Sequence, residues 1–415
     1  MRVLKFCFFL FPCFIYGSCS SNSNSKSTTQ NSGSDTVQKP VTVAMKHHFR
    51  VFNTGEVINH IPSIQDSGET FCLYLPKDYD STKSWPIIYL YDAHARGKLP
   101  VNKYKDLAEK YQLVLVGSNN SQNGLQPEAY DKIANDLFTT TQGILNISPT
   151  KIITAGFSGG GKVAATVAIK NSAVASVISC GAGLDIRSLG SGYFNYITVV
   201  GKGDFNYWDM IETDQQISKT PLKHLLLTFD GIHEWPDVKT MSEAIAFAMD
   251  PSTNNHKSAN SIDFSLEQKE MGIKNKYAGA FQKDDAGYWI GEVSKLNNGF
   301  KTGKNDGEKW MDRRLLSFIN MMSYLKASDL LNNKQLDAAG SYLNIFIASD
   351  PKNPDGRYLY ADWYALKEDK EGAISALNEA MKLGYDDFAH FSTDQMLASI
   401  QNEPGYQAVY KILSK

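Results

Sequence analysis

The feature that most constrains this chain is a serine enclosed by glycines in the segment TAGFSGGG, residues 154–161. An apolar run that favours a strand precedes it, and a run that favours a helix follows. A sharp turn from strand to helix lifts the hydroxyl of Ser158 clear of the backbone, where a base can take its proton. Side chains at Gly156 and Gly160 would collide across such a turn, and the backbone N–H of Gly159 stays free to hold a developing oxyanion. The segment predicts a nucleophile elbow.

A serine flanked in this way arises by chance in about one chain in ten of this length, so the surrounding sequence must decide. Strand-like and helical patterns alternate through the middle of the chain. The strand-like runs are 48–53, 70–75, 86–91, 113–117, 151–155, 175–180, 196–201 and 223–229, and the helical patterns are 102–111, 128–145, 161–170, 208–217 and 238–249. This order predicts an α/β fold with a doubly wound, mostly parallel sheet that helices cover on both faces.

Two more segments carry polar residues where predicted strands end. Asp204 lies in VGKGDFNY after the seventh strand-like run, and His233 lies in FDGIHEWP after the eighth. Together with Ser158 after the fifth run, this order resembles the α/β-hydrolase superfamily over residues 46–250. The histidine segment is similar to that of secreted esterases related to feruloyl esterases, polyester depolymerases and dienelactone hydrolases.

The resemblance implies a serine hydrolase that cleaves carboxylic esters through an acyl-enzyme intermediate, without a metal or another cofactor. Ser158 is the implied nucleophile, and His233 is the base that takes its proton and returns it to the leaving group. Asp204 is implied to fix the imidazole tautomer. The alternatives are a turn residue at Ser158, a core or capping histidine at His233, and a turn or cap at Asp204, with Asp185 and Asp209 also near strand ends.

Peptide cleavage is disfavoured within this class, because prolyl-oligopeptidase relatives usually carry an aromatic residue where this chain has Gly159. The second oxyanion donor is implied to lie in the loop YDAHARG, residues 91–97, which departs from the family's usual His-Gly start. We assign this donor to the backbone of Ala93 or His94, beside that of Gly159. The His94 side chain is also a candidate for substrate contact, with simple solvation as the alternative.

Other side chains at the same predicted edge of the sheet are candidates for substrate binding. Asn119 and Asn120 follow the fourth strand-like run, and an Asx turn is their alternative role. The aromatic candidates are Trp208, Trp235, Tyr193 and Phe194. An aromatic cleft would suit a phenolic or sugar-linked ester, whereas packing beneath long loops is the commoner fate of such side chains.

The N-terminus predicts export. Arg2 and Lys5 precede an apolar run too short to span a bilayer, and the tripeptide GSC follows, ending at Cys19. This ending resembles the lipobox of bacterial lipoproteins, which implies a signal peptide over 1–18, acylation of Cys19 and a lipid-anchored place in the bacterial cell envelope, periplasmic or at the cell surface. Tyr16 departs from the usual small aliphatic residue, so ordinary secretion is the alternative.

Residues 19–45 are rich in serine, asparagine and threonine and predict a disordered tether. Cys72 and Cys180 lie in apolar strand-like runs and are expected to be buried small hydrophobes, since they lack metal-ligand spacing. The formal net charge is -2, and no segment is dominated by lysine and arginine, which argues against binding of nucleic acid.

The composition changes beyond residue 250. Residues 251–312 are expected to form a connecting segment that mixes helical pieces, such as 264–271, with glycine-rich joins. Residues 313–415 are expected to form an all-α domain with terminal helices at 393–401 and 406–413. A spacing of 34 residues relates three pairs, which are Ala327 with Ala361, Ala339 with Ala373, and Leu343 with Leu377. Pro351 lies where the second helix of such a repeat ends. The pattern resembles the tetratricopeptide repeat, in which small residues let paired helices approach closely.

Two functional hypotheses follow. In the first, the chain is a membrane-anchored ester hydrolase acting on a small-molecule or glycan-linked ester, and its helical domain either binds a protein partner or buttresses the hydrolase. In the second, it is a lipid-anchored interaction protein whose hydrolase fold is a non-catalytic binding module. The complete set of Ser158, Asp204 and His233 favours the first.

Overall fold

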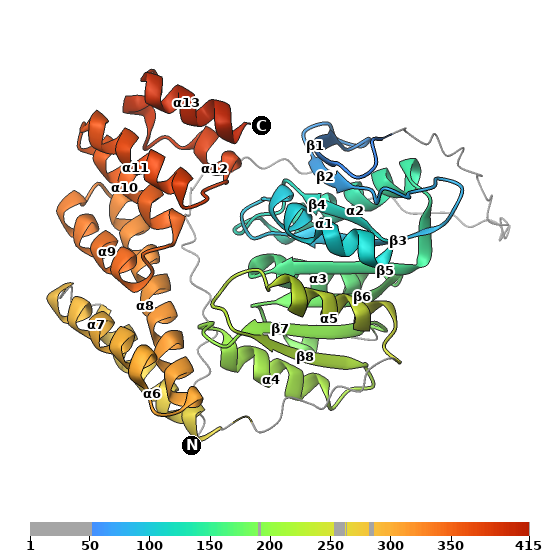
Figure 1. Ribbon diagram of the computed structural model, residues 1–415, viewed down its shortest axis with the longest axis horizontal. Coiled ribbons are helices and arrows are strands. Elements are labelled where there is room, and N and C mark those ends of the chain that lie inside the picture. Colours follow the sequence, from blue (N-terminus) through green and yellow to red (C-terminus); the bar gives the residue numbers. More distant parts are fainter. Residues whose placement is uncertain (1–51, 190–191, 253–261, 263, 282–285, 415) are drawn as a thin grey trace, which may run out of the picture. The chain divides into compact units, whose positions relative to one another are not determined.

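The computed structural model describes residues 52–189, 192–252, 262, 264–281 and 286–414 (Figure 1). The predicted signal peptide, Cys19 and the tether lie outside the described residues. Within them, a part built on a sheet (57–249, the sheet part) is followed by a part made of helices (265–413, the helical part). No helix within these described ranges is long and apolar enough to cross a bilayer.

The sheet part has an α/β fold. Its strands are β1 (Val57–Pro62), β2 (Thr70–Tyr74), β3 (Trp85–Tyr91), β4 (Val114–Ser118), β5 (Ile147–Phe157), β6 (Val174–Cys180), β7 (Asn195–Gly201) and β8 (His224–Phe229). They form one sheet in the order β1-β2-β4-β3-β5-β6-β7-β8, in which β1, β2 and β4 pair antiparallel and β4 through β8 pair parallel. The predicted doubly wound, mostly parallel sheet is confirmed.

The first strand-like run does not coincide with the strand that pairs with β2. Residues 48–51 lie outside the described residues, 52 and 53 are not in a strand, and the strand that pairs with β2 is β1, at Val57–Pro62. This strand occupies an edge of the sheet, and Ile61 is its only buried hydrophobic side chain. A strand that buries so few side chains leaves a weak apolar pattern in the sequence, because one face meets water and one neighbour is absent.

Helices cover both faces of the sheet (Figure 1). Side chains of α2 (Pro127–Ile144), α3 (Gly159–Lys170) and the end of α4 (Tyr207–Ile217) pack in one core, and those of α1 (Lys98–Tyr111) and α5 (Val238–Met249) pack in the other. Along β3, Ile87, Tyr89 and Tyr91 enter the first core, whereas Ile88 and Leu90 enter the second. Strands that are buried on both faces form nearly continuous apolar runs, which is why the sequence predicts them.

The helical part begins earlier than predicted. Its helices are α6 (Ser265–Phe281), α7 (Ala286–Thr302), α8 (Asp306–Asn332), α9 (Leu336–Ser349), α10 (Pro354–Leu366), α11 (Lys370–Lys382), α12 (Phe388–Thr393) and α13 (Pro404–Leu413). The expected boundary between 312 and 313 falls inside α8, and the supposed connecting segment supplies α6 and α7. Their glycines favour loops by propensity, but Tyr277, Phe281 and Trp289 are buried against α8 and α9, and this packing outweighs the propensity.

The helices from α8 to α11 form two antiparallel pairs, α8 with α9 and α10 with α11. All six residues related by the 34-residue spacing are buried. The predicted helix at 393–401 is wrong: α12 ends at Thr393, Asp394 leaves the helix, and only a short 3-10 turn follows at Ala398–Ile400. The relation to tetratricopeptide repeats stays a prediction.

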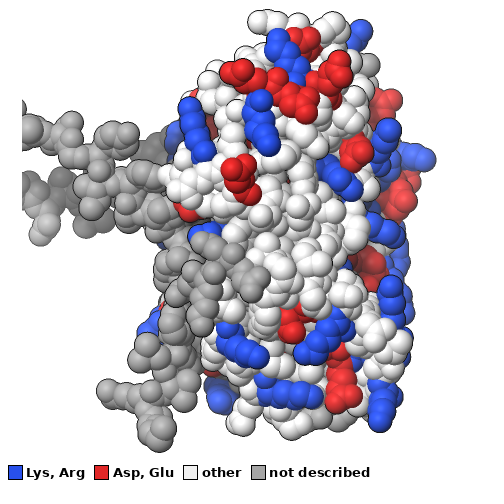
Figure 2. Space-filling view, turned by 90° about the vertical axis from the view of Figure 1, so that its left-hand side faces the viewer, with Lys and Arg blue, Asp and Glu red and all other residues white. Residues whose placement is uncertain are grey.

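Figure 2 views the molecule from the left-hand side of Figure 1. Basic and acidic side chains are interspersed on this face, and neither sign forms a continuous stripe.

Neighbouring alanines on α9 give a direct test of the helix packing. Ala339 is fully buried and Ala338 is exposed. We expect Ala339→Leu to lower the free energy of unfolding by about 1–3 kcal/mol, because extra methyl groups do not fit between close helices. Ala338→Leu should change it by less than about 0.5 kcal/mol. Thermal unfolding of both variants is the measurement, and equal stability would contradict the observed packing.

Candidate active site

Ser158 lies in a strained turn between β5 and α3. Its φ is 53° and its ψ is -124°, a conformation that non-glycine residues seldom adopt. Its N–H donates to the carbonyl of Cys180 at 2.9 Å, which ties the turn to the end of β6. A Cβ on Gly156 would overlap the carbonyl of Gly160, and a Cβ on Gly160 would overlap that of Tyr91. The close approaches expected at these two glycines are therefore present.

The structure brings Ser158, His233 and Asp204 together. Nε2 of His233 lies 2.9 Å from Oγ of Ser158. Its Nδ1 lies 3.0 and 2.9 Å from the two carboxylate oxygens of Asp204. The three residues come from the ends of β5, β7 and β8, which meet at one edge of the sheet. Of the alternative acids, Asp185 forms an ion pair with Arg187, at 2.7 Å.

The histidine and aspartate are enclosed by residues that sequence reasoning missed. The rings of Phe157 and Phe205 pack against the His233 imidazole, with centroids 4.7 and 4.4 Å away. Gly181 has a φ of 65°, and a Cβ there would come within 3.2 Å of both Asp204 and His233. The two phenylalanines directly neighbour Ser158 and Asp204 in the sequence, and this adjacency could have predicted that they lie at the site. Asp204 is 1% exposed, so its carboxylate depends on protein partners.

The predicted oxyanion donors lie close together. The end of β3 abuts the start of α3, and the side chain of Asn123 fills the space beside Gly159. The N–H of Asn123 donates to the carbonyl of Ala93 at 2.8 Å. The N–H of His94, however, donates to the Asp92 carboxylate at 2.9 Å. This N–H is occupied, which leaves Gly159 and Ala93 as the candidate donors and adds the Asn123 amide as a neighbour.

Asp92 links the oxyanion loop to the histidine loop. Its fully buried carboxylate accepts from Arg96 Nε at 2.8 Å and from the Trp235 indole N–H at 2.7 Å, in addition to His94. Burial raises the pKa of Asp92, but the charge of Arg96 and these hydrogen bonds outweigh it and hold the pKa below its usual value. Trp235 was predicted as a substrate contact. It is instead buried against Tyr104 and Phe157, because its N–H serves this carboxylate.

The other substrate-binding candidates have contacts that the sequence did not indicate. The Asn119 amide donates to the side chains of Asn59 and Thr70, at 3.1 and 3.2 Å, so it joins the end of β4 to β1 and to the start of β2. Tyr193 is 88% exposed, and Phe194 is buried in the core. Sequence position placed these residues at the correct edge of the sheet, but their side-chain directions depend on neighbours distant in the chain.

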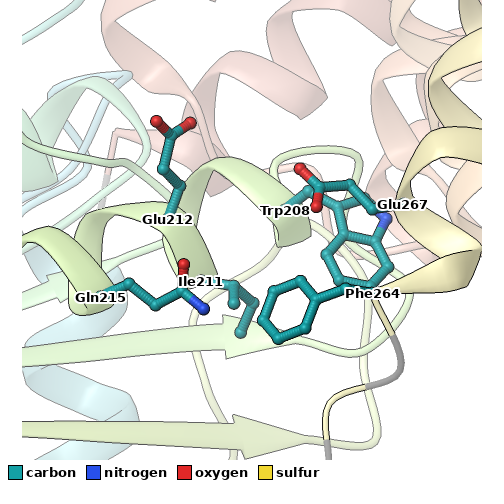
Figure 3. A pocket seen from close by; sticks show the side chains of 6 residues that line it. All are labelled: Trp208, Ile211, Glu212, Gln215, Phe264 and Glu267. Carbon is teal, nitrogen blue, oxygen red and sulfur yellow. The ribbon is translucent and has the colours of Figure 1, made fainter.

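Trp208 lies on α4 and packs against α6. Its indole N–H donates to Glu270 Oε2 at 2.9 Å. With Phe264 its ring forms one side of a surface cavity of about 480 Å³ (Figure 3). The lining residues are Trp208, Ile211, Glu212, Gln215, Phe264 and Glu267. None of these is a predicted catalytic residue, and the substrate-binding role of Trp208 stays a prediction.

The helical part also reaches the oxyanion loop. Nδ1 of His94 lies 3.6 Å from the Asp387 carboxylate, and Nη1 of Arg96 lies 3.7 Å from that of Asp386. Burial alone would lower the pKa of His94, but the hydrogen bond to Asp387 and the nearby carboxylates of Asp355 and Asp92 raise it above its usual value. Nothing in the sequence indicated this contact, since it joins segments that are far apart along the chain.

Among the described residues, no three His, Cys, Asp or Glu side chains are grouped so that they could hold a metal ion. Cys72 and Cys180 are free and buried, as predicted. Burial raises the pKa of Cys72 to about 12, so this thiol stays protonated at neutral pH.

No protein-family model and no curated protein matches this chain. Solved structures are similar to nearly half of it. An S-formylglutathione hydrolase from Staphylococcus aureus is 16% identical with a TM-score of 0.39, and the match covers 47% of this chain and 96% of that one. A feruloyl esterase module from Clostridium thermocellum, a serine-to-alanine mutant complexed with sinapinate, is 15% identical with a TM-score of 0.40, covering 49% and 91%. A truncated carbohydrate esterase from gut microbiota is 12% identical with a TM-score of 0.40, covering 48% and 97%. These similarities concern the fold.

The contact between His94 and Asp387 predicts a titration. We expect His94 to titrate above its usual pKa of about 6.5, and Asp387→Asn to lower this pKa, because burial remains while the acceptor charge is lost. The contact therefore adds stability below pH 6.5, which is lost as the pH rises through the raised value. NMR of the imidazole is the measurement. Asp386→Asn is the control and should leave the pKa raised, and an unchanged pKa in Asp387→Asn would refute the contact.

Proposed function

We propose that this protein is a serine hydrolase that cleaves carboxylic esters through an acyl-enzyme intermediate. The observation that carries the proposal is the continuous line of hydrogen bonds from Ser158 Oγ to His233 Nε2, at 2.9 Å, and from His233 Nδ1 to Asp204, at 2.9 Å. A serine hydroxyl needs a base within hydrogen-bond reach, and the base needs a partner that orients it. Both requirements are met by side chains from three separate loops.

Each residue has one task in the reaction. His233 Nε2 takes the proton of Ser158 as Oγ forms a bond to the ester carbonyl carbon, and the buried Asp204 stabilises the imidazolium. The N–H groups of Gly159 and Ala93 hold the negative oxygen of the tetrahedral intermediate. His233 then gives its proton to the alkoxide as the ester bond breaks. In the second half, His233 takes a proton from water as the water attacks the acyl carbon. His233 then returns this proton to Ser158 Oγ as the bond between Oγ and the acyl carbon breaks, which releases the acid.

The substrate proposed is a small-molecule or glycan-linked ester. Because Trp208 and Trp235 are engaged by Glu270 and Asp92, they do not support an aromatic-walled cleft. The aromatic rings at the site itself are those of Phe157 and Phe205, which contact His233. An ester panel that varies the acyl and alcohol groups separately would identify the class.

Removal of the nucleophile tests the proposal. With the full chain and a short-chain aryl ester, we expect Ser158→Ala to lower kcat by roughly 10⁴-fold or more, because only the oxyanion donors and binding remain. Ser81→Ala, at an exposed serine, is the matched control and should keep full activity. A fluorophosphonate should label the wild type but not Ser158→Ala. Equal hydrolysis by the wild type and Ser158→Ala would reject Ser158 as the nucleophile, whereas neither hydrolysis nor labelling by the wild type would favour the non-catalytic interaction protein.

We also propose that Cys19 carries lipid and anchors the chain in a bacterial membrane, with GSC at 17–19 as the support. Acyl chains contribute about 0.8 kcal/mol of membrane binding per buried CH₂, so several chains anchor firmly. We expect Cys19→Ser to move the protein from the membrane fraction to the soluble fraction of an expressing bacterium, whereas Ser23→Ala should not. Recovery of Cys19→Ser in the membrane at the wild-type level would contradict the anchor.

A further inference from the structure

The loop that carries Asp204 is held from two sides. On the sheet side, its N–H groups are bonded: that of Lys202 donates to Phe229 at 2.9 Å, that of Gly203 to Gly231 at 2.8 Å, and that of Asp204 to Gly201 at 3.0 Å. The carbonyl of Asp204 accepts from the N–H of Tyr207 at 3.0 Å. The carbonyls of Lys202, Gly203 and Phe205 accept from side chains outside the sheet part, as buried backbone groups need partners.

The helical part supplies the missing donors. Arg314 Nη1 donates to the carbonyl of Lys202 at 2.9 Å, and Ser317 Oγ donates to that of Gly203 at 2.7 Å. Lys274 Nζ donates to the carbonyl of Phe205 at 2.9 Å. The first two donors lie on α8 and the third on α6. Carbonyls on both sides of Asp204 are thus bonded to side chains of the helical part.

These donors are themselves fixed by a buried carboxylate. Glu270 is fully buried, and it contacts Arg314 Nε and Lys274 Nζ at 2.8 Å each. The Arg314 guanidinium also lies over the rings of Tyr207 and Trp208, with centroids 4.7 and 5.3 Å away. Buried ion pairs add little stability for their desolvation cost, but they restrict geometry. The ion pairs of Glu270 are therefore better suited to fixing the position of the Asp204 loop than to stabilising the contact between the two parts.

The held loop bears directly on the histidine. Phe205 follows Asp204, its ring packs against the His233 imidazole at 4.4 Å, and it also joins the core of the helical part. A shift of this loop would therefore move both the carboxylate and a wall of the imidazole. Displacements of about 1 Å in a catalytic group can cost up to about 100-fold in rate.

We propose that Arg314, Ser317 and Lys274 are positioning residues that hold the Asp204 loop in the orientation required by His233. The helical part is then a working component of the active site, in addition to any partner that it binds. This inference rests on the proposed function, since it assigns to these residues a role in ester hydrolysis by Ser158.

Two single-donor variants of the full chain test the inference. We expect Ser317→Ala and Lys274→Met each to lower kcat for an aryl ester by about 10-fold with little change in KM, because neither residue contacts substrate. The rate of fluorophosphonate labelling at Ser158 should fall in parallel. Steady-state kinetics, labelling rates and thermal unfolding are measured on the same preparations.

The chain offers matched controls. Ser323 is a buried serine on α8 whose hydroxyl bonds to Ile319 in its own helix, at 2.7 Å. Lys276 is an exposed lysine on α6. Ser323→Ala and Lys276→Met should retain wild-type kcat.

Equal losses of kcat in Ser317→Ala and Ser323→Ala, or wild-type kcat and labelling in both Ser317→Ala and Lys274→Met, would overturn the inference. If Ser158→Ala abolishes hydrolysis in the same series, the proposed function stands even where the positioning inference is overturned. Hydrolysis by Ser158→Ala at the wild-type rate would instead remove the basis of both.

Discussion

The hydrogen bond between the buried carboxylate of Asp204 and Nδ1 of His233 is the interaction on which the site depends. A carboxylate that is 1% exposed has lost its water and is stable only with well-placed donors. Its donors here are the imidazole and the N–H of Asn206, which lies 2.8 Å from Oδ1. Because Nδ1 is engaged in this way, Nε2 faces Ser158, and the imidazole is directed toward the hydroxyl that it would deprotonate.

Two kinds of framework hold this interaction in place. The parallel sheet delivers the ends of β5, β7 and β8 to one edge, which brings the three loops within reach of one another. The helical part then contacts two of the surrounding loops, that of Asp204 through Ser317 and that of His94 through Asp387. By packing against the sheet part, the helical part buries some of its own apolar and charged side chains. The buttress hypothesis for the helical part is thus supported by specific contacts.

Sequence reasoning succeeded where structure follows from local pattern. The strands from β2 to β8 were predicted within a few residues because they are apolar runs buried on both faces, and Ser158, Asp204 and His233 were found because each follows such a run. It failed where tertiary packing overrides local preference. The edge strand β1 buries little, and the glycine-containing helices α6 and α7 form because Trp289 and its neighbours pack against α8. The substrate-contact predictions for Trp208, Trp235 and Asn119 did not anticipate that the polar atoms of these side chains bond to buried or cross-strand partners.

The amino-acid sequence by itself determined the fold class, the nucleophile turn and the order of the three polar residues, because strand periodicity and the sharp turn at Ser158 are properties of adjacent residues. Only the tertiary structure decided which side chains hold those residues in place. The ties from Glu270 to Arg314 and from Asp92 to Trp235 join side chains that lie 44 and 143 positions apart. The segment around each residue does not identify its partner, since the role of a buried charge is set only when the chain has folded and water has been replaced by a specific donor.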